Sequence, residues 1–176
     1  MDKQDLAERI LRIEEENAIH GLVYRYASLC DDRYSPDALA ALFLEDASWS
    51  AASSDGELDF GTHRGRDAIR NHFAGLPARI GVPTLHAVMA PEISLASDGT
   101  SATGRWYTIV LLTMLGASDG STNVVMLGAT YEHDYTKVNG EWLFSRVAAH
   151  FHFHLPVGTE VAAKIGKLGS AENIRK

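Results

Sequence analysis

The first thirty residues show the spacing of an amphipathic helix. Its apolar positions recur mostly at intervals of three and four, which places them on one helix face. This pattern predicts one long helix over residues 5–30. Arg33-Tyr34-Ser35-Pro36 follows, and proline disfavours helical backbone at the residue before it. The residues of the predicted core face are Leu6, Ile10, Ile13, Ile19, Leu22, Val23, Tyr26 and Cys30.

Three shorter segments come next. Ser35-Pro36-Asp37 is typical of a helix start, with a capping serine, a proline in the first turn and an acidic residue at the positive end. Residues 47–51 and 57–62 read as two short strands joined by a turn at 53–56. Residues 67–76 predict a third helix.

The remainder of the chain up to residue 154 has a strand-like pattern. Four long apolar-rich runs cover 84–96, 102–113, 123–137 and 141–154, with short turn signals at 98–99, 118–120 and 139–140. Such runs predict an antiparallel meander, and helices followed by a sheet predict the α+β class. We expect a cone-shaped, curved antiparallel sheet, four long strands plus the short hairpin, wrapped around the long N-terminal helix and two shorter helices.

A long twisted sheet of this kind curls and leaves a cavity between itself and the helix, which is a natural place for a small molecule. We expect residues 1–157 to form a single domain. Residues 158–176 read as a C-terminal tail that is lightly packed or flexible.

Composition narrows the range of functions. The 176 residues carry a net charge of −7, which argues against nucleic acid or an anionic membrane as partner. Cys30 is the single cysteine, so no internal disulfide forms, and on a helical core face it reads as a small buried hydrophobe. With no secretory signal and no apolar run of membrane-spanning length, we expect a cytoplasmic protein. Nucleotide and phosphate-loop motifs are absent, so any catalysis is expected to need no cofactor.

Tyr26, Asp31 and His86 are the candidates for acid–base chemistry. Tyr26 points at the core, and Asp31 reaches the same cavity only if the helix ends near Cys30. His86 lies early in the first long strand, where a partly buried imidazole needs a hydrogen-bond partner. If Asp31 is that partner, the pair forms a dyad that can take a proton from carbon. The alternative is a core tyrosine, a solvated aspartate and a structural histidine bonded to a backbone carbonyl.

The last strand carries His150, His152 and His154 on one face, by alternation, with Phe151 and Phe153 on the other. We expect His150 and His152 to line the cavity and bind substrate oxygen. A solvated histidine face and a metal site built on His150-x-His152 are the alternatives, and we predict no metal. The aromatic residues predicted to line the pocket, although core by default, are Trp49, Trp106 and Tyr131.

Several motifs resemble those of a known family. Tyr-x-x-x-x-Asp closes the first helix at 26–31, Leu-Phe-x-x-Asp-Ala spans 42–47, and Gly-Arg-Asp-Ala-Ile at 65–69 precedes the third helix. With the meander, they resemble the SnoaL-like group of the nuclear transport factor 2-like superfamily over residues 5–155. The segment 86–107 is very similar to the corresponding part of the scytalone dehydratase and bile-acid 7α-dehydratase branch.

This resemblance implies roles for the three candidates. His86 would abstract the proton, Asp31 would orient and charge it, and Tyr26 would bind or polarise a substrate oxygen. The implied activity is a cofactor-independent, dehydratase-type lyase acting on a small hydrophobic cyclic substrate such as a steroid, polyketide or aromatic compound. An isomerase or cyclase with the same dyad, and a non-catalytic ligand-binding or accessory subunit, are the alternatives.

The chain also departs from its relatives. The bile-acid enzyme has a functional arginine near the end of its last strand, whereas residues 149–152 here contain none. We expect either His150 or His152 in its place or a substrate that lacks the group that the arginine serves. The resemblance further implies a homodimer or a higher oligomer formed through the sheet, which long strands with alternating apolar residues favour.

Overall fold

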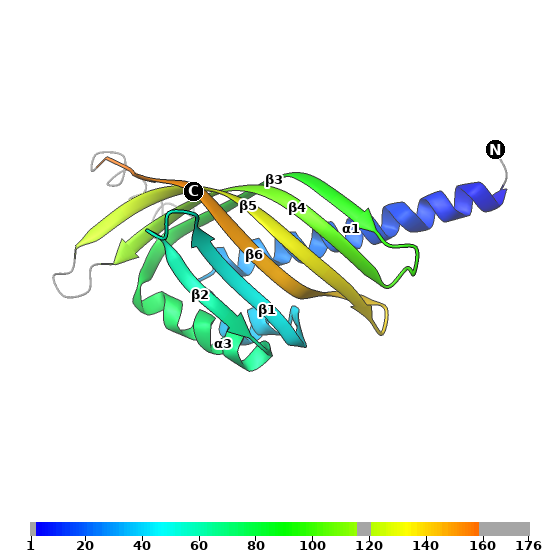
Figure 1. Ribbon diagram of the computed structural model, residues 1–176, viewed down its shortest axis with the longest axis horizontal. Coiled ribbons are helices and arrows are strands. Elements are labelled where there is room, and N and C mark those ends of the chain that lie inside the picture. Colours follow the sequence, from blue (N-terminus) through cyan, green and yellow to red (C-terminus); the bar gives the residue numbers. More distant parts are fainter. Residues whose placement is uncertain (1–2, 116–120, 159–176) are drawn as a thin grey trace, which may run out of the picture.

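A long helix lies against the concave face of a curled six-stranded sheet (Figure 1). The computed structural model describes residues 3–115 and 121–158. These observations confirm the predicted α+β class. The helices are α1 (Lys3–Asp31), α2 (Pro36–Ala40) and α3 (Arg66–Gly75), followed by a short 3-10 turn, Leu76–Ala78. The strands are β1 (Phe43–Ser53), β2 (Asp59–Arg64), β3 (Ile80–Leu95), β4 (Ser101–Leu115), β5 (Thr122–Val138) and β6 (Glu141–Pro156).

The strand order is β2-β1-β6-β5-β4-β3, so β3 to β6 form the predicted meander. Asn139 and Gly140 both have positive φ angles, 52° and 88°, as a tight hairpin turn of the type I′ kind requires. The sheet is mixed rather than wholly antiparallel, because β1 runs parallel to β6. Turn signals determine the relative direction only of strands adjacent in sequence, and almost ninety residues separate this pair.

Strand β3 begins earlier than predicted. The first long run was expected to start at residue 84, yet the strand starts at Ile80. Because β3 is an edge strand and its pairing with β4 is interrupted between Gly81 and Leu85, a proline without an N–H group costs no ladder hydrogen bond there.

Helix α1 buries apolar side chains against the sheet only in its second half, although Glu15 also accepts a hydrogen bond from the Trp142 indole at 2.6 Å. Residues from Ile19 to Cys30 on its inner face are buried, but Leu6, Ile10 and Ile13 are 43–56% exposed. The predicted core face is therefore wrong for these three residues, because the helix projects beyond the end of the sheet (Figure 1). None of the helices in the described part of the chain is long and apolar enough to cross a membrane.

Two predictions fall on residues that are not described. The turn at 118–120 and nearly all of the tail at 158–176 lie outside the described ranges. The domain boundary near residue 157 likewise stays a prediction.

Candidate active site

The end of helix α1 determines where its polar residues lie. The helix closes after Asp31 because Arg33 and Tyr34 take left-handed backbone angles, with φ of 59° and 55°. The Tyr34 amide then donates to the Leu29 carbonyl oxygen at 3.1 Å. Left-handed backbone costs a residue with a side chain on the order of 1 kcal/mol. This turn brings the Tyr34 ring back against the pocket, where it is buried.

Asp31 and His86 make the contact that the sequence predicted. The Asp31 carboxylate accepts the His86 backbone N–H at 3.2 Å, and its other oxygen lies 2.7 Å from His86 Nδ1. The side chains are 27% and 8% exposed, respectively. An ionised carboxylate can only accept hydrogen bonds, so Nδ1 carries the proton. In the neutral ring, Nε2 is then left with its lone pair free.

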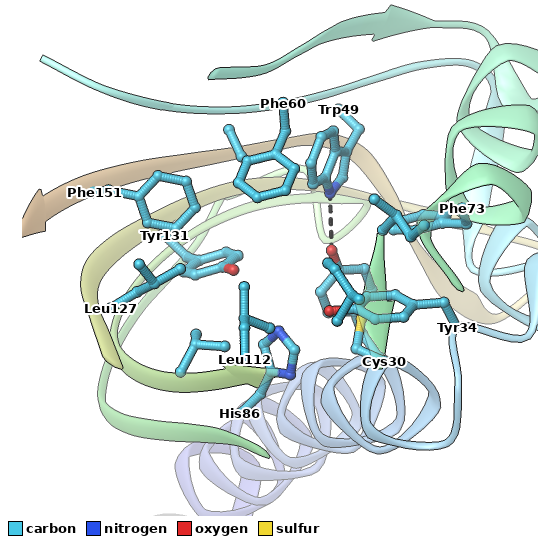
Figure 2. A pocket seen from close by; sticks show the side chains of 15 residues that line it. Cys30, Tyr34, Trp49, Phe60, Phe73, His86, Leu112, Leu127, Tyr131 and Phe151 are labelled. Atoms are coloured by element: carbon cyan, nitrogen blue, oxygen red, sulfur yellow. Dashed lines mark hydrogen bonds between the residues drawn. The ribbon is translucent and has the colours of Figure 1, made fainter. Parts of the chain in front are cut away.

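Figure 2 shows the His86 ring at the floor of an apolar pocket, with one nitrogen turned toward α1 and the other toward the interior. About 400 Å³ of space in this pocket is free of atoms, its opening to solvent included. The site therefore offers a proton acceptor inside apolar walls. The apolar side chains that line it include Phe60, Phe73, Leu112, Leu127 and Phe151.

Three tyrosines bring hydroxyl groups to the same pocket. Burial raises the pKa of Tyr26, Tyr34 and Tyr131 above that of an ordinary phenol, so all three are neutral donors at pH 7. The Trp49 indole donates to the Tyr26 oxygen at 2.8 Å (Figure 2). This bond leaves the Tyr26 proton available for another acceptor. Neutral donors facing one base are what elimination or proton transfer requires.

Cys30 also lines the pocket, as a buried free cysteine. Burial raises the pKa of its thiol, so it is a neutral group at pH 7. This agrees with its sequence reading as a small buried hydrophobe.

The aromatic residues predicted to bind substrate are divided between two cavities. Trp49 lines the main pocket, and Tyr131 lines both cavities. Trp106 lies instead in a smaller recess next to it, completely buried, and its indole donates to Tyr135 Oη at 3.1 Å.

His150 and His152 do not line the pocket, which corrects the sequence prediction. His150 Nε2 lies 3.8 Å from a Glu132 carboxylate oxygen, His152 Nε2 lies 2.6 Å from Thr130 Oγ1, and both residues are exposed. Strand alternation turns Phe151, between them, into the pocket. Neither histidine can therefore take the place of the arginine of the bile-acid enzyme.

The third histidine of this strand is not a pocket residue either. A bulge at His152 shifts the register between Gly128 and Ala129, after which His154 lies 3.4 Å from a carboxylate oxygen of Glu57. Within residues 3–115 and 121–158, no group of three histidine, cysteine or acidic side chains is placed to hold a metal ion.

Sequence reasoning missed Tyr34 and Phe151 as pocket residues. For Phe151 a signal existed, because Val147 and Ala149 precede it at alternate positions and share its buried face. For Tyr34 there was none, since the turn that folds it back depends on backbone angles that its neighbours do not encode.

Comparisons with known proteins agree with this fold. The hexachlorocyclohexane dehydrochlorinase LinA type 2 has a similar structure, with a TM-score of 0.72 at 19% identity, over 86% of this chain and 94% of that one. A proposed scytalone dehydratase of Novosphingobium aromaticivorans gives 0.71 at 23% identity, over 86% and 93%. A nuclear transport factor 2-like protein with a cystatin-like fold, also from N. aromaticivorans, gives 0.62 at 24% identity, over 93% and 96%.

At these identities the structural likeness establishes the fold alone. A comparison with curated protein sequences finds no match. The SnoaL-like domain family, in contrast, matches residues 11–148, which is most of the chain and includes α1, Asp31 and His86. The chain therefore belongs to the SnoaL-like domain family and has the nuclear transport factor 2-like fold.

Proposed function

We propose that this protein is a cofactor-independent lyase that eliminates water, or another small leaving group, from a small hydrophobic cyclic molecule such as a steroid, polyketide or aromatic compound. One observation carries the proposal. His86 is bound through Nδ1 to Asp31, and its second nitrogen is free beside an apolar pocket. A base in such a place can reach a carbon acid while water is excluded.

The residues supply each part of an elimination. His86 Nε2 takes the proton from carbon, and the electron pair of that C–H bond forms the new double bond. The leaving group departs with the electron pair of its own bond and takes a proton from a neutral phenol, with Tyr26 the first candidate, or from the imidazolium. Asp31 holds the ring in place and stabilises the positive charge that it acquires.

The names of two similar structures support this class of reaction. One is called a dehydrochlorinase and the other a dehydratase, so both names describe eliminations with different leaving groups. An isomerase or cyclase would share the first proton transfer and keep every substituent. An accessory subunit, in contrast, needs neither the His86–Asp31 contact nor an open pocket, and the presence of both favours a catalyst.

A panel of cyclic ketones with a hydroxyl group β to the carbonyl tests the proposal. In D₂O, elimination gives an absorbing enone and a product lighter by one water, whereas isomerisation gives deuterium uptake without loss of mass. We expect His86→Gln to lower the rate by roughly 10²–10⁴-fold. His150→Gln, on the outer face, should leave it unchanged.

Full activity of His86→Gln would overturn the assignment of the base. Saturable binding of these ketones without turnover or deuterium uptake would replace the lyase by a ligand-binding module.

We also propose that the protein forms a homodimer or a higher homo-oligomer through the outer face of its sheet. Large apolar side chains of β3, β4 and β6 are exposed there, and Met89 of β3 is paired with Tyr107 of β4. A monomer in water rarely exposes such a patch. A second copy is the occupant to which this face is best suited, because identical patches are self-complementary around a twofold axis. The residues, 41–50% exposed, are Leu85, Met89, Tyr107, Phe153 and Leu155.

A further inference from the structure

A second, smaller cavity lies behind the main pocket. Tyr26, His86 and Tyr131 line both cavities, so these three side chains stand where the two meet. About 250 Å³ of space in and around this narrow recess is free of atoms, its opening to solvent included. Its lining also includes Trp106 and His133, a histidine of β5 that is 2% exposed. The proposed mechanism uses neither of them.

A chain of hydrogen bonds determines the tautomer of His133. The Trp106 indole can only donate, and it donates to Tyr135 Oη at 3.1 Å. His133 Nδ1 lies 2.9 Å from the same oxygen. If Tyr135 donates its proton to Nδ1, every polar group in this series of hydrogen bonds has a partner except Nε2 of His133. In the opposite tautomer Nδ1 would carry the proton, and two groups would be unpaired: the Nε2 lone pair of His133 and the hydroxyl proton of Tyr135. Leaving that buried donor without an acceptor costs about 1–3 kcal/mol.

His133 Nε2 therefore carries the proton, and it lies on the ring edge away from Tyr135. This atom is buried and has no hydrogen-bond partner in the described part of the chain. Burial lowers the pKa of His133 to about 3, so the ring is neutral at pH 7. A fixed, uncharged N–H donor is thus left unsatisfied in a residue that lines the recess.

We propose that His133 Nε2–H binds an uncharged oxygen acceptor, of the ketone carbonyl type, on the part of the substrate that enters the recess. His133 is then a positioning and specificity-determining residue. A carbonyl brings an acceptor and no further proton, which matches a single donor. A carboxylate would have to leave water for apolar walls without a cation, which is costly. This inference rests on the proposed function in one respect: the molecule that His133 binds is taken to be the same molecule from which His86 removes a proton.

The test compares 2-decalone with 2-methylenedecalin. The two compounds have nearly the same shape, but the carbonyl oxygen of the first is replaced in the second by a methylene group, which cannot accept a hydrogen bond in the same way. Nitrogen-15 spectra of the wild-type histidine rings should show His133 protonated at Nε2. Its Hε2 resonance should move downfield with 2-decalone and stay in place with the methylene compound. A His133 ring protonated at Nδ1, or an Hε2 chemical shift that 2-decalone does not change, would overturn the inference.

An Hε2 resonance of His133 that does not respond to 2-decalone would show that the proton has a partner within the protein. The Phe144 ring is 5.0 Å from that of His133 in an edge-to-face arrangement, and a proton on its face would be shifted upfield by the ring current. A buried water holding the proton would give a constant signal with both compounds. Either result would assign Nε2–H a structural role.

Binding constants of variants give the second arm. Wild-type protein should prefer 2-decalone by on the order of fivefold, which is the worth of one net hydrogen bond, and His133→Leu should lose that preference. His72→Leu is the matched control, because His72 Nε2 is also buried without a partner but His72 lines neither cavity. A preference retained by His133→Leu would overturn the inference, and if that variant does not fold, the wild-type spectra decide.

The two proposals can fail separately. Turnover by wild-type protein with an unresponsive His133 proton would leave the lyase standing without this subsite. A responsive proton without turnover would establish the subsite and remove the lyase.

Discussion

Replacing Asp31 with asparagine keeps the shape of the side chain but changes what it offers to His86. The wild-type carboxylate accepts two donors, the backbone N–H of His86 and its Nδ1–H. An amide has one oxygen and one NH₂ group. The backbone proton is fixed, so the amide oxygen must stay opposite it and the NH₂ group must face Nδ1. The imidazole proton then moves to Nε2, and the lone pair no longer faces the pocket.

The magnitudes separate catalysis from folding. A hydrogen bond to a charged group contributes about 1.5–3 kcal/mol and a neutral one about 0.5–1.5, so exchanging both bonds costs roughly 2–3 kcal/mol of unfolding free energy. Asp31 is the last residue of α1, where removing a negative charge returns about 0.3–1 kcal/mol through the helix dipole. The net loss of stability is therefore about 1–3 kcal/mol. A histidine held in the wrong tautomer, in contrast, lowers kcat by about 10⁴-fold in a serine-protease triad.

Asp32→Asn is the matched control. It removes the same charge from the same helix end, from an exposed side chain. We expect urea denaturation to place Asp32→Asn within about 1 kcal/mol of wild type and Asp31→Asn about 1–3 kcal/mol below it. Nitrogen-15 spectra should show the tautomer change only for Asp31→Asn, and turnover should fall far more in that variant than its small loss of stability explains. An unchanged His86 tautomer in Asp31→Asn, or equal activity of the two variants, would refute the reasoning.

Three further outcomes follow from the packing, the buried histidines and the outer face. Gly104→Ala should cost about 1–3 kcal/mol of unfolding free energy in urea, because its Cβ would lie 2.8 Å from the Tyr135 hydroxyl oxygen; a loss below 0.5 kcal/mol would contradict this packing. The pKa of His133 is lowered to about 3 and that of His72 to about 4, both by burial, so the unfolded chain binds more protons below pH 6.5 and stability should fall by about 2–4 kcal/mol between pH 6.5 and 4.5, with the partly exposed His72 contributing less. Constant urea midpoints across that range would contradict it. Met89→Lys should shift the light-scattering mass toward that of the monomer, and an unchanged mass would exclude this face.

The parts of the fold that were predictable are those that adjacent residues encode. Apolar spacing gave the inner face of α1 from Ile19 to Cys30, and dipeptides such as Asn139-Gly140 gave the meander. The parallel pairing of β1 with β6 was not predictable, because strands so far apart share no turn that relates their directions. The exposure of the first part of α1 was not predictable for a similar reason. Periodicity shows which face of a helix is apolar but not how far the sheet extends beneath that face.

The histidines of β6 show why the sequence led to a wrong prediction of which residues line the pocket. A run of three at alternate positions is conspicuous, and chemistry-bearing side chains are readily assigned to a cavity. The apolar row Val147, Ala149 and Phe151 identifies the inner face of this strand more reliably, because burying apolar area is favourable at every position, whereas a buried histidine requires a partner at each one. His86 meets that requirement through Asp31, and His150 does not need to, since it is exposed.

The placement of Tyr34 depends on strain that no side-chain pattern reveals. Two consecutive left-handed residues, Arg33 and Tyr34, end α1 at a cost of on the order of 1 kcal/mol each, although Ser35-Pro36 follows immediately and could have ended the helix without strain. One further helical turn would carry Tyr34 away from the pocket and leave its aromatic contacts with Phe73 and His86 unmade. Burying this ring offsets the strain, since an aromatic side chain contributes about 1.5–3 kcal/mol when it leaves water. The strained turn therefore persists because it holds the Tyr34 ring in the pocket, against the proposed base His86.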